Sequence, residues 1–117
     1  MNANIRMWGW ELLSHLDERM DRAICDYLLN QAMLMLAAQP GAIFIGQNVC
    51  YDGNVMYKDL AGIPMSQRRE LPVCEELQMG IGTGLALQGF LPISIYPRID
   101  FLILAMNQLV NHLDKLA

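Results

Sequence analysis

The sequence predicts an α/β domain in which helices sandwich a parallel sheet of few strands. Two short apolar runs, 42–45 and 92–96, have the length and composition of buried strands. Each run follows a chain-breaking signal, Pro40-Gly41 in the first case and Gly89 in the second. Segments with helical periodicity lie between and around them. An alternation of helices and strands favours right-handed crossovers and therefore parallel strands.

The helices are expected on both sides of these strands. The pattern predicts a short amphipathic helix or arm over 6–19 and a stronger helix over 21–38, which Asp21 caps and 39–41 ends. Segment 46–70 is expected to be mostly loop with one short helix, and 71–74 to be briefly extended. A helix over 75–88 follows, and the last helix, 101–115, is expected to be capped by Asp100.

The chain of 117 residues is long enough for one domain and not for two. We divide it into an N-terminal helical arm, 1–20, and a partial α/β domain, 21–117. Trp8, Trp10 and three leucines give the arm its apolar surface. Two or three strands are too few for a self-sufficient sheet, because an edge would stay exposed. The α/β layer is therefore expected to be completed by another chain or to be truncated.

The composition predicts a homo-oligomer. Hydrophobic residues make up 54% and charged residues 17% of the chain, which is more apolar surface than so small an interior can bury. The nine methionines suit adaptable packing surfaces. In addition, the run FLILAMNQLV in the last helix carries no charge, and a helix that is apolar all round is buried on all sides.

Several classes of partner and location are excluded by the same composition. The net charge is −4 and the basic residues are scattered, which argues against nucleic-acid binding. No apolar run reaches the roughly 18 residues of a membrane span, and the first residues lack the pattern of a signal peptide. The three cysteines have no CxxC spacing, which favours free, buried thiols over a disulfide framework or a metal site. We therefore expect a cytoplasmic protein.

The carboxylate pair Glu75-Glu76 is the main candidate for chemistry. It stands at the head of a helix, where two carboxylates also have a plain structural role, since they complement the positive end of the helix dipole. Neighbouring residues do not share a helix face, so only one of the two is expected to point inward. Arg98 is a second candidate, either for a substrate carboxylate or as an ordinary exposed arginine.

The segment Gly80-Ile81-Gly82-Thr83-Gly84 invites a nucleotide-binding interpretation. A dinucleotide fingerprint has its glycines at the turn between a strand and a helix. Here the helix-like residues EELQM precede the first glycine. Close packing of the helix backbone against a neighbour is the better explanation.

The glycine spacing carries a family resemblance. Glu75, Gly80, Ile81, Gly84 and Gly89 fit the pattern E-x-x-x-x-G-I-x-x-G-x-x-x-x-G without a gap. The match continues through Pro92-Ile93, Asp100-Phe101, Ala105, Gln108 and Asn111, and upstream it includes Phe44-Ile45-Gly46 and Tyr51-Asp52-Gly53. From about residue 22 onward the chain resembles the pyrimidine-binding, transketolase-like domain of thiamine-diphosphate enzymes. It is similar in particular to the beta subunit of the 2-oxoacid (pyruvate) dehydrogenase decarboxylating component.

The resemblance implies an incomplete thiamine-diphosphate-binding fold of the pyrimidine type, with thiamine diphosphate as cofactor. Glu75 would be the catalytic glutamate that hydrogen-bonds the aminopyrimidine, ideally in a pocket that excludes water. Phe101 would pack against the aminopyrimidine ring, and Val73 would line the same pocket. Phe101 is equally well explained as a core aromatic at a helix start. Gln47 stands at a cofactor-binding position where the family usually has an acid, and an amide cannot exchange a proton.

The resemblance also implies a partner chain. The family holds the diphosphate and its magnesium through a GDG motif and an asparagine of a separate alpha-type subunit, and this chain has neither and no metal ligands of its own. The family continues beyond the point where this chain stops, so the chain is expected to be truncated. The first function predicted is the pyrimidine-side half-site of a 2-oxoacid dehydrogenase or transketolase-like enzyme. The alternatives are a non-catalytic oligomeric binding or structural protein that keeps the fold, and a fragment without function of its own.

Overall fold

The computed structural model describes residues 3–116, with side chains described from Asp17 onward. The arm residues Trp8 and Trp10 and their three leucine neighbours are among those whose side chains lie outside the described part. The helices and strands, in chain order, are α1 (Ala3–Ala37), β1 (Ala42–Gly46), α2 (Val55–Asp59), β2 (Arg68–Glu70), α3 (Glu75–Leu87), β3 (Leu91–Ile95) and α4 (Ile99–Asn111), and short 3₁₀ turns cover Met65–Gln67 and Leu113–Lys115.

The three strands form one parallel sheet in the order β2-β1-β3. The register pairs Phe44 of the central strand with Arg68 on one side and with Ile93 on the other. Phe44 and Ile45 are almost completely buried, because β1 has a neighbour on each side and helices on both faces. The predicted α/β class and the parallel direction of the strands are therefore confirmed.

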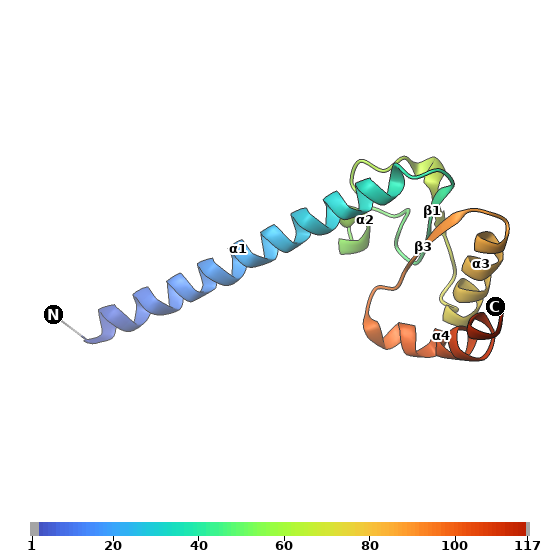
Figure 1. Cartoon of the computed structure of the whole chain (residues 1–117). Helices are drawn as coiled ribbons and strands as arrows, with labels where there is room; N and C mark the ends of the chain where they lie inside the picture. Colours follow the sequence, from blue (N-terminus) through green and yellow to red (C-terminus); the bar gives the residue numbers. More distant parts are fainter. Residues whose placement is uncertain (1–2, 117) are drawn as a thin grey trace.

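The two faces of the sheet are covered by different helices (Figure 1). Phe44 belongs to a core cluster with Val49, Leu60 and Ile63, and the last turns of α1 pack against this cluster. Ile45 points to the opposite face, as successive strand residues do. There its Cδ1 atom lies 3.5 Å from the point where a Cβ would stand on Gly82 of α3. The predicted sandwich is thus formed by the end of α1 on one face and by α3 on the other.

Helix α1 is a single helix of 35 residues, and its amino-terminal part extends away from the sheet (Figure 1). A helix of that length measures about 52 Å, and the molecule is 69 Å long but only 30 Å and 25 Å across. The predicted cap at Asp21 is wrong, because this residue lies within the helix. A capping residue does not start a new helix where the residues before it already form one and no proline intervenes.

Three further details differ from the sequence prediction. Asp100 lies in the first turn of α4 and Arg98 occupies the capping position, so Asp100 is not the cap and instead places its charge near the helix start. The third strand is Arg68–Glu70 rather than an extended 71–74. Cys25 and Cys74 are free as expected, but both are exposed and only Cys50 is half-buried.

Among the described residues, no helix combines the length and the apolar character that a membrane crossing requires.

Candidate functional site

Glu75 and Gln47 meet at the edge of the sheet where the parallel strands end. Glu75 is the first residue of α3, and Gln47 directly follows β1; both are buried, with 5% and 7% of their surface exposed. The Gln47 Nε2 atom donates a hydrogen bond to Glu75 Oε1 over 3.3 Å. Glu76 is exposed and accepts a hydrogen bond from Asn107 Nδ2 of α4 at 3.1 Å. The prediction that only one of the two carboxylates points inward is confirmed.

Gly46 explains how the chain can leave β1 so that Gln47 enters this site. Its φ of 154° favours glycine, and a Cβ at this position would stand 2.3 Å from the carbonyl oxygen of Ile95 in β3. A residue with a side chain would push β1 and β3 apart at the edge where Gln47 begins its loop. The site therefore depends on glycine here for steric reasons.

The loop that carries Gln47 is fixed by Glu70, at the end of β2. Its carboxylate accepts hydrogen bonds from three successive backbone N–H groups, those of Asn48 at 2.6 Å, Val49 at 2.9 Å and Cys50 at 3.0 Å. Asn48 has a φ of 62°, which turns these groups toward the carboxylate. Glu70 was not predicted as a site residue. It is separated from the loop by some 20 residues, and only the pairing of β2 with β1 brings them together.

Gln78 fastens the start of α3 to β3, one turn after Glu75. Its side chain is fully buried, and Nε2 donates to Ser94 Oγ at 2.8 Å and to the Ile95 carbonyl at 2.9 Å. Its Oε1 atom is buried and finds no hydrogen-bond partner among the described residues. The Gln78 contacts hold the helix that presents Glu75, so Gln78 is a second supporting residue that sequence reasoning missed.

The other two predicted site residues are not joined to this pair. Val73 is 75% exposed, on the segment that leads into α3. Phe101 is half-buried in the first turn of α4, and the Arg98 guanidinium carbon lies 4.9 Å from the centre of its ring. Within the described part of the chain, no hydrogen bond or ring contact connects Phe101 or Val73 with Glu75. Their roles as pocket residues stay predictions.

The glycines of GIGTG lie inside α3 and not at the turn before it, so the geometry of a dinucleotide fingerprint is absent. Gly82 faces Ile45, but a Cβ on Gly80 or Gly84 would meet nothing within 4 Å. The expected close neighbour of these two glycines is therefore not found within the described chain, and their side of α3 is open.

No family model matches the sequence, and no curated protein matches it significantly. Among the described residues, no group of three or more His, Cys, Asp or Glu side chains is arranged to hold a metal ion. The candidate site consists of a buried carboxylate at a helix start, held by a neutral amide.

Proposed function

We propose that this chain provides the pyrimidine-side half-site of a thiamine-diphosphate-dependent enzyme of the 2-oxoacid dehydrogenase or transketolase-like kind. The observation that carries this proposal is the buried carboxylate of Glu75 at the carboxyl edge of a parallel sheet. Open parallel sheets bind their ligands at this edge. The sequence resemblance implies that the same residue, Glu75, hydrogen-bonds the aminopyrimidine of the cofactor. We also propose that the small α/β fold is an incomplete fold of the pyrimidine-binding type.

The donor set fits an aminopyrimidine. Glu75 is buried, and its hydrogen-bond partner among the described residues is an amide rather than a cation. A carboxyl in this state can accept or give a proton at a ring nitrogen without first breaking an ion pair. Gln47 holds one carboxyl oxygen of Glu75 and so orients the other. Because the Gln47 amide cannot exchange a proton, no proton relay continues from Glu75 through Gln47. Thiamine diphosphate supplies the carbanion chemistry when it is bound.

In this proposal, the rest of the site comes partly from a second chain and partly from other residues of this one. A separate alpha-type chain holds the diphosphate and its magnesium, and Phe101 and Val73 line the pyrimidine pocket. The 75% exposure of Val73 fits a residue that a ligand or a partner chain covers. The enzyme acts on a 2-oxoacid or a ketose-like donor in the cytoplasm.

Calorimetric titration with thiamine diphosphate and magnesium tests the proposal on the purified chain, with and without a diphosphate-binding alpha chain. Three proteins are compared: the wild type, Glu75→Ala, and Glu76→Ala as the matched control on the exposed neighbour. Saturable binding that Glu75→Ala removes and Glu76→Ala keeps would support the half-site. If all three bind alike, or if none binds although an alpha chain is present, the proposal is wrong.

A second candidate function, a non-catalytic oligomeric binding or structural protein, is favoured by the surface of α4. Five apolar residues recur along this helix and the turn after it with alternating spacings of four and three residues, and all are exposed: Ile99, Ile103, Met106, Val110 and Leu113. This spacing is the signature of a seam between two helices. Homo-oligomerisation through this seam would bury it without any cofactor. A stable oligomer without affinity for thiamine diphosphate, measured by sedimentation and by the titration above, would favour this candidate.

A further inference from the structure

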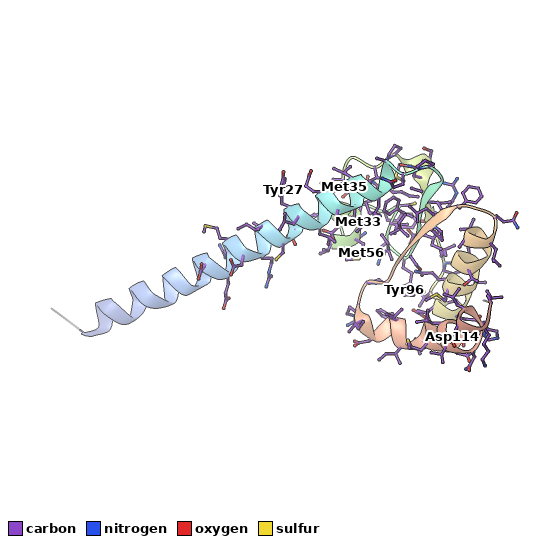
Figure 2. The ribbon with its side chains drawn as sticks, viewed as in Figure 1. Tyr27, Met33, Met35, Met56, Tyr96 and Asp114 are labelled. Atoms are coloured by element: carbon purple, nitrogen blue, oxygen red, sulfur yellow. The ribbon has the colours of Figure 1, made fainter. Side chains whose placement is uncertain are left out.

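A cavity of about 280 Å³ lies on the other face of the sheet from Glu75. Its walls come from three elements that are distant in sequence: Leu29 and Met33 of α1, Met56 of α2, and Ile93 and Ile95 of β3. Figure 2 shows Met33, Met56 and Tyr96, which reach it from α1, from α2 and from the end of β3. An apolar cavity of about half this volume is enough to bind benzene.

Two polar groups of the cavity lack partners. Asp59 lies on its wall at the end of α2, and no hydrogen bond or ion pair of its carboxylate is found among the described residues. The side-chain amide of Asn30 donates to the backbone carbonyl of Asp59 at 2.9 Å, so the position of Asp59 is fixed while its carboxylate is left free. The hydroxyl of Tyr96 is buried, and within the described chain it too has no partner. Buried polar groups normally have partners, so the Tyr96 hydroxyl invites a ligand. The carboxylate of Asp59, which is only partly buried on the wall of the same cavity, is free to pair with that ligand.

The charge at this wall is negative. Burial, and next the negative charge of Asp26 on α1, raise the pKa of the Asp59 carboxyl above its ordinary value of 3.8. Both effects oppose the ionised carboxylate, and the positive charge of a cation placed beside Asp59 would offset them. The adjacent wall offers two thioethers, which make favourable contacts with the edges of aromatic rings.

We propose that this cavity binds a small arylalkylamine, with the ammonium group at Asp59 and the aromatic body against Met33, Met56 and Ile93. The cavity accommodates a bicyclic ring with a short chain by volume. The Tyr96 hydroxyl gains a hydrogen-bond partner when an ammonium N–H donates to it. Because the cavity and Glu75 lie on opposite faces of the sheet, this inference does not depend on the proposed thiamine-diphosphate function.

Titration of the full chain with tryptamine tests the site, and indole-3-ethanol serves as the neutral analogue of nearly the same shape. Tryptamine is expected to bind at least about tenfold more tightly than the alcohol, as a charge-assisted hydrogen bond requires. Asp59→Asn should reduce tryptamine binding to the level of the alcohol. Asp17→Asn, which removes the same charge from an exposed position on α1, should leave the binding unchanged.

Met33→Trp, which fills the cavity, should weaken the binding of both molecules, and circular dichroism establishes that each variant is folded. Equal affinity for amine and alcohol, or tryptamine binding that Asp59→Asn leaves unchanged, would overturn the proposal. So would the absence of any binding. If tryptamine fails to bind and Met33→Trp also makes an oligomer of the chain dissociate in sedimentation, the cavity instead binds another copy of the chain.

Discussion

Gln47 Nε2 and Glu75 Oε1 are joined by a buried hydrogen bond of 3.3 Å that links the loop after β1 to the first residue of α3. The distance is longer than the 2.9–3.0 Å typical of N–H···O bonds. The donor is also neutral, so the bond fixes the direction of the carboxylate without pairing its charge. Glu75 is therefore deeply buried, while the partner of its carboxylate among the described residues is a neutral amide and not a cation. These two properties distinguish it from an ordinary exposed carboxylate at a helix start.

Gln47→Ala tests whether this bond matters for the fold. We expect the free energy of unfolding to fall by about 1–3 kcal/mol, because a buried acceptor loses its donor. Urea denaturation followed by circular dichroism measures the change. Gln39→Ala is the matched control, since the Gln39 side chain makes an exposed hydrogen bond to the Met35 carbonyl. Its effect should stay within about 0.5 kcal/mol. Equal losses in both variants would show that the Gln47–Glu75 bond has no special weight.

Gly46→Ala should disrupt the sheet edge on which the site is built. The new Cβ would stand 2.3 Å from the Ile95 carbonyl oxygen, and backbone in a sheet cannot give way as a flexible side chain can. We expect a loss of about 3 kcal/mol or more, or no folded protein at all. Gly53→Ala is the matched control. Gly53 also has a positive φ, 93°, but a Cβ at this position would meet nothing within 4 Å. This substitution should cost only the conformational penalty of about 1–2 kcal/mol. Similar stability of the two variants would contradict the steric argument.

Ile103→Glu tests the exposed seam of α4. Ile103 is 67% exposed, so the substitution should leave the isolated fold intact and prevent a second chain from packing on the seam. We expect the oligomer to dissociate at micromolar concentration, measured by sedimentation velocity. Leu87→Glu makes the same change at another residue that is 67% exposed, on α3. Dissociation by Leu87→Glu alone would place the interface on α3, whereas a wild-type chain that is already monomeric would refute the seam altogether.

The fold could be predicted wherever the signal was local. Strand 42–45 and helix 75–88 were predicted within one or two residues of β1 and α3, because proline and glycine bound them and their composition is apolar. Strand β2 was missed because it is three polar residues long. Its first residue, Arg68, is buried and donates hydrogen bonds to the carbonyls of Val49, Leu60 and Ile63, which overrides any local preference for an exposed loop.

The site was predictable only in part for the same reason. Glu75 could be singled out because a helix start and an apolar surrounding are visible within a few residues. The contact with Gln47 spans 28 residues and exists because α3 begins beside the end of β1, which is a property of the crossover. Glu70 and Gln78, which hold the two partners in place, act through the same long-range pairing. Only the three-dimensional arrangement assigns them to the site.

Asp59 gives the protein a specific dependence of stability on pH. Because burial and Asp26 raise the folded-state pKa of Asp59 above 3.8, the folded state holds the proton more tightly than the unfolded chain does. The Asp59 contribution to stability therefore falls as the pH rises from about this value through the folded-state pKa, and it stays lower above that. Asp59→Asn, which cannot ionise, should raise the thermal midpoint at pH 7, and its advantage should vanish below pH 3.8. Thermal melts of both proteins across this range measure the difference, and Asp17→Asn controls for net charge. An advantage that persists unchanged at low pH would mean that the asparagine stabilises the fold by some route other than the missing charge.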